Sequence, residues 1–298
     1  GNKENLISQG WESFEPYGYG SGVSLFRQWN LDKVTELDDR EWSGVYSNAE
    51  LIEDVLRTSY NGNANKLSRF FPQNQSIEPD KKYIMRIKIR NPFWDVHLFS
   101  GSLKWVDAGS IGYRMPKSEE FVVHEIEVVG TNDNNRLELY YSHSRFPQDV
   151  NIGEYFDIAW LSLTPIDNQH LVVEKTPLGN GLTRIQTWGG SADMKLKSPS
   201  FGQLAETGTD MTISLYVENN SDSSVRFSNN LTIGGVSYPD GAEYMITVPR
   251  EYKGFAYLKG EKVDGTVELD IRSDGNIDMI VSQPEIIEGH NLNAMLLI

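Results

Sequence analysis

The chain has 298 residues, a formal net charge of −15 and no cysteine. This charge argues against a nucleic-acid backbone or an anionic membrane surface as partner; it suits a neutral or cationic partner such as a polysaccharide, or solubility alone. The lack of cysteine excludes disulfides, a thiolate nucleophile and cysteine-bound zinc. No apolar run reaches the roughly 18 residues of a membrane-spanning helix. The length, with 39% hydrophobic residues, supports two domains with real cores.

The first half of the chain reads as short strands separated by turns. Residues 5–11 are expected to form the start of a short strand followed by a turn. Residues 12–22 are rich in Gly, Tyr and Ser, which indicates a loop. Residues 47–50 resemble a capping box, and the apolar residues that follow have helical spacing, which predicts one short helix over residues 51–56. Further strands are expected at residues 23–29, 67–71, 83–90, 97–99, 111–114, 121–129, 137–141 and 154–165. Many short strands between turn clusters indicate a β-sandwich.

The stretch from Tyr83 to Arg90 has the clearest alternation. Its apolar side chains Met85, Ile87 and Ile89 are expected to face a core. The alternating cations are then expected to face outward. These are Arg86, Lys88 and Arg90.

The second half repeats the first in the same phase. Met211–Asn219 aligns with Tyr83–Asn91, and Val267–Leu269 aligns with Leu137–Leu139. A polar stretch at residues 166–170 follows the proline that ends the long strand at 154–165. We therefore expect an all-β chain of two tandem jelly-roll β-sandwich domains, one at residues 1–167 and a second, smaller one of the same type at residues 168–298.

Three stretches of the chain carry a family resemblance. They are the opening Asn5-Leu-Ile7, the Tyr83-x-x-x-Ile87-x-Ile89 strand after a proline-containing turn, and the closing Tyr155-Phe-Asp-Ile-Ala-Trp-Leu-Ser-Leu163. Together they resemble the jelly-roll carbohydrate-binding modules of the family 4, 9 and 22 type. The second closing segment, Ser282-Gln-Pro-Glu-Ile-Ile-Glu-Gly-His290, resembles modules in phage tail and baseplate proteins, such as accessory baseplate proteins of lactococcal-type phages.

Sugar binding needs flat aromatic rings that stack on pyranose rings and planar polar groups that bind hydroxyls. Six of the seven tryptophans precede residue 161, so the first domain is expected to bind and the second to support or dock. The tryptophans set among polar and turn residues are the candidates for stacking, with a ring that closes the end of the sandwich as the alternative. The predicted ligand-binding residues are Trp94, Trp105, Tyr113, Arg114, Tyr140 and Trp42.

The resemblance also implies a structural Ca²⁺ near the start and the closing strand of each module. The matching carboxylate is Asp157 in the first copy and Asp278 in the second, and Glu12 is a further possible ligand. The alternative is that Asp157 caps a turn or pairs with a cation. Ca²⁺ takes six or more oxygen ligands, and the sequence identifies no others.

Catalytic signals are poor. The chain has no H-E-x-x-H, G-x-S-x-G or Walker loop, and its five histidines show no ligand spacing. Together with these absent motifs, the resemblance implies a non-enzymatic, carbohydrate-binding protein of a virion tail or baseplate, or an extracellular one, with a cell-surface polysaccharide and other tail proteins as partners. The alternatives are a structural adaptor that binds no sugar, and a glycan hydrolase or its binding part.

Overall fold

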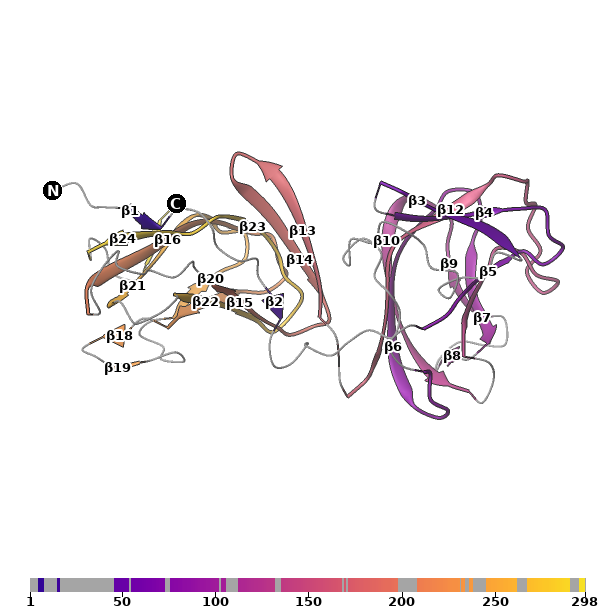
Figure 1. Ribbon diagram of the computed structural model, residues 1–298, viewed down its shortest axis with the longest axis horizontal. Helices are drawn as coiled ribbons and strands as arrows, with labels where there is room; N and C mark the ends of the chain where they lie inside the picture. Colours follow the sequence, from indigo (N-terminus) through magenta and orange to yellow (C-terminus); the bar gives the residue numbers. More distant parts are fainter. Residues whose placement is uncertain are drawn as a thin grey trace. The chain divides into compact units, whose positions relative to one another are not determined.

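The structure is a computed structural model, and most of the residues that it describes lie in β-strands (Figure 1). The described residues are 5–7, 15–16, 46–53, 55–72, 76–101, 103–105, 112–131, 135–167, 169, 171–197, 208–230, 232–233, 236–237, 245–261, 267–289 and 295–297. These ranges contain no helix, and so none that could span a membrane. The prediction of an all-β chain is confirmed.

The chain divides into two compact units. The first unit is residues 22–170, and the second is residues 171–298 together with residues 1–21. The N-terminal segment belongs to the second unit because β1 (Asn5–Ile7) pairs with β24 (Glu285–Glu288). The structure therefore divides the chain differently from the expected 1–167 and 168–298, chiefly in where the first 21 residues go.

The first unit consists of two antiparallel sheets. Its large sheet has the order β3 (Ser47–Ile52), β4 (Val55–Tyr60), β12 (Tyr155–Pro165), β6 (Lys82–Asn91), β10 (Ser118–Gly130), β8 (Leu103–Trp105). Its small sheet has the order β5 (Leu67–Phe70), β11 (Leu137–Tyr140), β7 (Val96–Gly101), β9 (Tyr113–Met115). Without the edge strands β3 and β8, the sheets read β4-β12-β6-β10 and β5-β11-β7-β9, which is the jelly-roll arrangement of eight strands.

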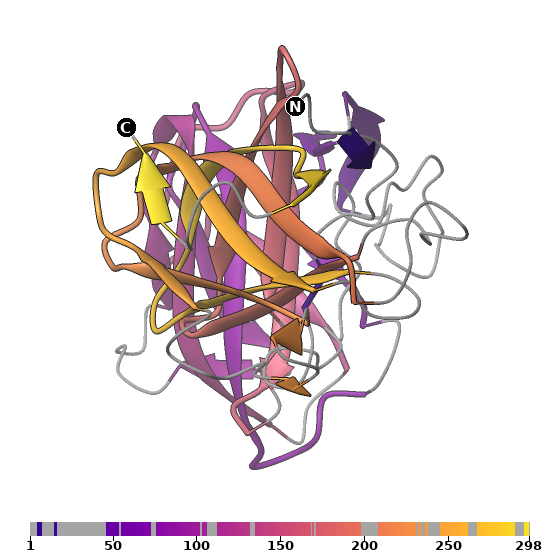
Figure 2. The ribbon, with the colours of Figure 1, turned by 90° about the vertical axis from the view of Figure 1, so that its left-hand side faces the viewer.

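The second unit has the same central order. Its large sheet runs β13 (Val172–Gly179), β14 (Leu182–Trp188), β23 (Asp278–Ser282), β16 (Asp210–Asn219), β21 (Lys253–Glu261), β18 (Thr232–Ile233), β19 (Val236–Ser237). Its small sheet runs β2 (Glu15–Pro16), β15 (Ala192–Lys197), β22 (Glu268–Ser273), β17 (Val225–Asn229), β20 (Ile246–Val248). The strand β24 also pairs with β16, and β25 (Met295–Leu297) pairs with β21 near the C-terminus (Figure 2). The cores β14-β23-β16-β21 and β15-β22-β17-β20 form a second jelly roll.

Each unit has its own hydrophobic core, built from alternate residues of its strands. In β6 the side chains of Met85, Ile87 and Ile89 are fully buried in the core of the first unit. In β16 the residues Ile213 and Val217 are fully buried in the core of the second. The predicted alignment of these two strands is confirmed, since both occupy the third place in the four-strand jelly-roll sheet.

A buried asparagine closes the end of the central strand in the first unit. Asn91, the last residue of β6, is 1% exposed. Its Nδ2 donates to the carbonyl oxygens of Trp94 at 2.8 Å, Met115 at 3.2 Å and Pro116 at 3.2 Å. One side chain therefore ties the loop after β6 to the chain that leaves β9.

The second unit repeats this asparagine corner. Asn219, the last residue of β16, is fully buried, and its Nδ2 donates to the carbonyl oxygens of Ser223 at 3.2 Å, Val248 at 3.0 Å and Pro249 at 3.2 Å. In both units, two of the three acceptors are equivalent. They are the carbonyl oxygens of the last residue of the matching strand, β9 or β20, and of the proline that follows it. The corner therefore fixes which residues of the two units are equivalent, with Asn91 matching Asn219.

The predicted short helix at residues 51–56 is wrong. These residues lie in a hairpin in which β3 pairs with β4, and Glu53 at the turn has a φ of 48°. Burial alternates along β4, with Leu56 and Thr58 buried and Arg57 half-buried. Instead of capping a helix, the Ser47 hydroxyl accepts a 3.0 Å hydrogen bond from Ser68 of β5. Hairpin pairing and core contacts outweigh the local helical spacing.

Candidate functional site

The Trp94 ring lies in the core of the first unit. Its side chain is 1% exposed and stacks on Tyr141 with ring centroids 4.6 Å apart. Phe156 packs edge-on against it at 6.5 Å. The loop after β6 turns inward because Asn91 holds the Trp94 carbonyl, and the ring closes the end of the sandwich. The prediction that Trp94 offers an exposed stacking ring is wrong.

The other predicted ligand-binding residues do not form one platform. Tyr113 packs against the core, whereas Arg114 projects from the opposite face of β9 and is exposed. Arg114 and Tyr140 lie in one row on the outer face of the small sheet, because both pair in register with His97. Trp105 is in β8, opposite Val128, but its side chain is not described. Trp42, like Glu12, lies outside the described residues.

The polar groups of that small-sheet row are engaged within the chain. Arg114 forms a 2.7 Å ion pair with Asp95. The Tyr140 hydroxyl donates to Glu138 at 2.8 Å; burial, and then this hydrogen bond, raise the pKa of Tyr140. The Tyr140 hydroxyl and the Arg114 Nε therefore already have partners within the chain, whereas the rest of the Arg114 side chain, which is 60% exposed, remains open to solvent.

A different set of side chains forms a row on the outer face of the large sheet. Glu50 of β3 pairs in register with Arg57 of β4, Arg57 with Asp157 of β12, and Asp157 with Arg90 of β6. Neighbouring strands are about 4.8 Å apart, so these four side chains cross the sheet in a line. We call Glu50, Arg57, Asp157 and Arg90 the charged row.

Asp157 holds both arginines of the charged row. Arg57 donates from Nε at 2.8 Å and from Nη2 at 3.1 Å to the two carboxylate oxygens. Arg90 donates from Nη2 at 2.6 Å and from Nε at 3.2 Å to Oδ2. The carboxylate is fully buried, whereas the side chains of Arg57 and Arg90 are 23% and 35% exposed. The hydrogen bond that Arg57 donates to Asp157 raises the pKa of Arg57, although burial opposes it.

Aromatic rings hold the two guanidinium planes. The guanidinium of Arg57 lies over the Tyr155 ring, 3.6 Å from its centroid, and that of Arg90 lies 4.7 Å from the centroid of Phe121. Phe93, in the loop after β6, packs edge-on against Tyr155 at 5.2 Å and is 40% exposed. The charged row is therefore rigid, and an exposed ring lies beside it.

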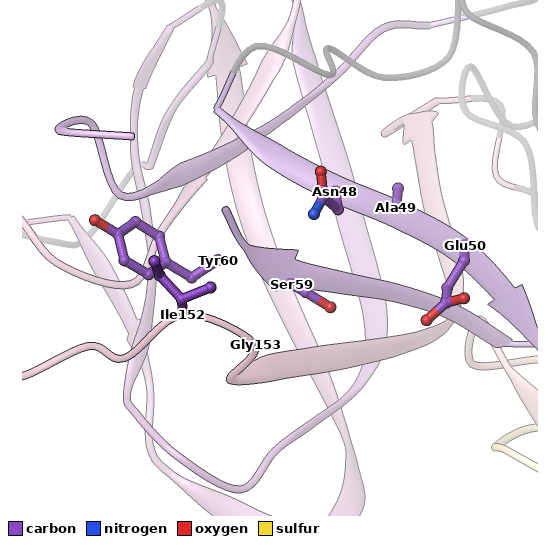
Figure 3. A pocket seen from close by; sticks show the side chains of 7 residues that line it. All are labelled: Asn48, Ala49, Glu50, Ser59, Tyr60, Ile152 and Gly153. Atoms are coloured by element: carbon purple, nitrogen blue, oxygen red, sulfur yellow. The ribbon is translucent and has the colours of Figure 1, made fainter. Parts of the chain in front are cut away.

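A pocket of about 350 Å³ opens at the β3 end of the charged row (Figure 3). Asn48, Ala49 and Glu50 of β3 and Ser59 and Tyr60 of β4 line one side, and Ile152 and Gly153 line the other. In Figure 3 the Ile152 side chain lies beside the Tyr60 ring, with the carboxylate of Glu50 at the far end. We call this the edge pocket; it joins polar groups to an apolar surface.

Backbone contacts hold the loop that carries Ile152 against β4. The Gly153 N–H donates to the Tyr60 carbonyl at 3.1 Å, and the Tyr60 N–H donates to the Glu154 carbonyl at 2.9 Å. Gly62 has a φ of 91°, and a Cβ there would lie 3.2 Å from Ile152. Ile152 is nevertheless 75% exposed, so this loop presents an apolar side chain at the surface.

The other end of the same outer face is covered. Arg86 is 4% exposed, and it donates to Glu125 at 2.7 Å and to Gln169 at 3.0 Å. Ser162 and Thr164 of β12 are fully buried. The open part of the face is therefore limited to the charged row, its rings and the edge pocket.

The residues around Asp157 and Asp278 do not fit a calcium site. Both oxygens of Asp157 accept from arginines, which would repel a divalent cation. Asp278 is held in the same way by Arg184, at 2.8 and 3.0 Å. Across the described ranges, no group of three or more His, Asp or Glu is placed to hold a metal. The calcium ligands implied by the resemblance are thus corrected to arginine partners, which was the stated alternative for Asp157.

The charged row is not repeated in the second unit. From the matched asparagines, the position of Arg90 corresponds to Glu218, and its ladder partner is Ile280 instead of an aspartate. Ile280 pairs with Arg184, and Arg184 pairs with Thr176. The equivalent row is therefore Thr176, Arg184, Ile280 and Glu218. Asp278 lies two residues before the position of Asp157, so the sequence match of these aspartates is wrong in register.

Comparisons with known proteins add little to this geometry. No family model and no curated protein matches the chain. Similar solved structures include the tandem CBM22-1–CBM22-2 domain of Paenibacillus barcinonensis Xyn10C, at 7% identity over 92% of this chain and 100% of that chain, with a TM-score of 0.25. A structure of Sulfolobus Turreted Icosahedral Virus has 13% identity, 92% and 68% coverage and a TM-score of 0.25. Paenibacillus xanthan lyase has 12% identity over 82% of this chain, a TM-score of 0.27, and only 25% of its own length covered. At such scores these likenesses carry no argument, and the jelly-roll assignment rests on the strand order.

Sequence reasoning found one member of the charged row, Arg90, through the alternation of its strand. It missed Arg57, because residues 51–56 read as a helix, and it placed Asp157 in the wrong kind of site. Tyr155 was assigned only to a buried strand. A strand reading of Val55–Tyr60, with Arg57 facing outward, was the available signal.

Proposed function

We propose that this protein is a non-enzymatic carbohydrate-binding protein, and that the saccharide lies on the outer face of the large sheet in the first unit. The observation that carries the proposal is the charged row, whose arginines are held between a buried carboxylate and aromatic rings beside the edge pocket. These side chains are ordered before any ligand arrives, so binding costs less conformational entropy.

The chemistry of the face suits a sugar chain. The exposed ring of Phe93 and the exposed side chain of Ile152 offer surfaces for the C–H faces of pyranose rings. Asn48, Ser59 and Glu50 offer an amide, a hydroxyl and a carboxylate for sugar hydroxyls. The open distance from β4 to β6 is about 10 Å, two strand spacings, so the face can accept more than one sugar ring.

The carboxylates of this face support binding without hydrolysis. A glycosidase needs a pair of carboxyl groups, one of which donates a proton to the leaving group. Asp157 is fully buried, and both of its carboxylate oxygens accept hydrogen bonds from arginines, so neither oxygen is free to contact a leaving group. Glu50 alone cannot supply both functions.

We also propose the setting that the sequence resemblance implies, a virion tail or baseplate that recognises a host-surface saccharide. In that setting the second unit, which lacks the charged row, would dock to other tail proteins. Its outer face carries Phe255, 47% exposed, with Tyr216 at 5.5 Å and Tyr257 at 6.3 Å. This aromatic surface also favours the second candidate function, a structural adaptor that binds no sugar.

A glycan array and titration with cell-wall polysaccharides would test the proposal. Phe93→Ala should lower the affinity for any saccharide that binds by roughly tenfold, with the melting temperature nearly unchanged because the ring is partly exposed. Phe255→Ala is the matched control, an exposed ring on the second unit, and should leave the affinity unchanged. No binding to any glycan, or equal losses from both variants, would favour the adaptor.

A further inference from the structure

Two arginines of the charged row share one buried carboxylate. Asp157 is a single fully buried negative charge, yet two guanidinium groups approach it to 2.6 and 2.8 Å. The shared anion outweighs the repulsion between the two guanidinium groups, but Asp157 and its two arginines together still carry one net positive charge. Glu50 lies in register with Arg57 and attracts it, so the remaining positive charge is greatest at Arg90, where a second anion would be stabilised.

The arginines present hydrogen-bonding capacity at the surface. Each uses Nε and Nη2 to bind Asp157, and among the described residues neither Nη1 has a hydrogen-bond partner. Each guanidinium plane is fixed by a ring, Tyr155 for Arg57 and Phe121 for Arg90. A planar guanidinium that is fixed in this way matches a carboxylate or phosphate group better than a hydroxyl.

The two ends of this face differ in charge. Lys88 lies two residues before Arg90 on the same side of β6, 6.0 Å from the centroid of the same Phe121 ring. At the other end the exposed Glu50 carboxylate borders the edge pocket. An acidic group would be attracted to the Arg90 end and repelled at the Glu50 end, where neutral hydroxyls fit better.

We infer that the saccharide of the proposed function is acidic. It carries a carboxylate or a phosphodiester that binds Arg57 and Arg90, while a neutral sugar of the same chain occupies the edge pocket. This inference rests on the proposed function. The protein has a net charge of −15, which repels polyanions in general, so the two arginines provide the local attraction for the anionic group of the saccharide.

The test compares four polymers on the intact protein. Polygalacturonate carries carboxylates, polyglycerol-phosphate teichoic acid carries phosphodiesters, carboxyl-reduced polygalacturonate is neutral, and polyglutamate is an anion without sugar. We expect at least one acidic saccharide to bind at least tenfold more tightly than the neutral polymer and polyglutamate. Its affinity should fall as salt rises, because part of the attraction is screened. The stronger of the two acidic polymers identifies the anion.

Variants locate the anion on the face. Arg90→Gln should lower the affinity for the acidic saccharide roughly ten- to a hundredfold. Arg90→Lys should restore only part of this affinity, because lysine keeps the charge without the planar group. Glu50→Gln should strengthen binding slightly. Arg184→Gln in the second unit is the matched control, since it also removes an arginine bound to an aspartate, and it should leave binding unchanged.

The outcomes separate this inference from the proposed function. Equal binding of the neutral and acidic saccharides would overturn the inference and leave carbohydrate binding in place. Binding of polyglutamate as strong as that of the saccharides would also overturn it, by showing simple ion exchange. Failure of every saccharide tested here and on the glycan array would overturn both. Melting curves of each variant show whether a loss of affinity comes from unfolding.

Discussion

The outer faces of the two large sheets differ, although the strands beneath them match. At equivalent positions the first unit has Glu50, Arg57, Asp157 and Arg90, and the second has Thr176, Arg184, Ile280 and Glu218. The asparagine corner, by contrast, recurs with the same set of acceptors. The difference teaches that the inner framework and the outer chemistry of this fold vary separately.

The largest expected effect concerns a ring that only the first unit has. Trp94→Ala should lower the stability of the first unit by about 3–5 kcal/mol, because it leaves a cavity beside Tyr141 and Phe156. Hydrogen exchange measured by mass spectrometry can assign the loss to residues 22–170. Phe255→Ala, at a partly exposed ring, serves as the control and should cost much less. A Trp94→Ala protein with unchanged exchange rates would refute the buried position.

Substitutions at the asparagine corner should lower stability slightly less than Trp94→Ala, and by the same amount in the two units. Asn91→Ala and Asn219→Ala should each cost about 2–4 kcal/mol in their own unit, because buried carbonyl groups lose their donor. The same exchange measurement, run on both variants, checks whether the corner is a shared device. If one variant were silent and the other strongly destabilised, the equivalence of the two residues would fail.

The two aspartates should differ when each is changed to asparagine. Asp157→Asn should lower stability by about 1–3 kcal/mol, since a buried charge with two partners is lost. Asp278→Asn should cost less than about 1 kcal/mol, because Asp278 and Arg184 are 29% and 43% exposed. Thermal melting of both variants measures this, and excess chelator should leave the wild-type curve unchanged. A chelator-dependent fall in the melting temperature that Asp157→Asn abolishes would restore the calcium site.

The smallest effect should be a difference in acid sensitivity. Burial lowers the pKa of His97 and of His124 from the ordinary 6.5, whereas no histidine lies among the described residues of the second unit. A lowered histidine pKa means that the unfolded chain binds protons first, so the stability of the first unit should fall as pH drops below about 6.5. Exchange rates at pH 7 and pH 5.5, compared between the units, measure it. A His97→Gln, His124→Gln double variant should flatten the response; an unchanged response would assign it to other groups.

Part of this molecule follows from local pattern. The alternation of Tyr83–Arg90 correctly places Met85, Ile87 and Ile89 in the core and Arg90 outside, because side-chain direction in a strand depends only on neighbours along the chain. The in-phase match with Met211–Asn219 identifies the equivalent strand for the same reason.

The rest depends on contacts between distant residues. Polar neighbours suggested an exposed Trp94, but Tyr141, 47 residues further on, covers the ring. Arg57 and Asp157 are 100 residues apart in the sequence, so only the pairing of their strands reveals that an arginine already binds this carboxylate. Residues 51–56 fit a helical repeat locally, and only the pairing of β3 with β4 turns them into a hairpin.

The asparagine corner bears on how such a protein can change over generations. Because one inward-facing side chain secures the loops at the end of each central strand, substitutions on the outward side do not disturb it. One unit can therefore change the chemistry of its outer face while still folding. For the same reason, the charged row could be transferred to the second unit. The substitutions Ile280→Asp and Glu218→Arg, together with the existing Arg184, would place two arginines around one aspartate, as in the first unit.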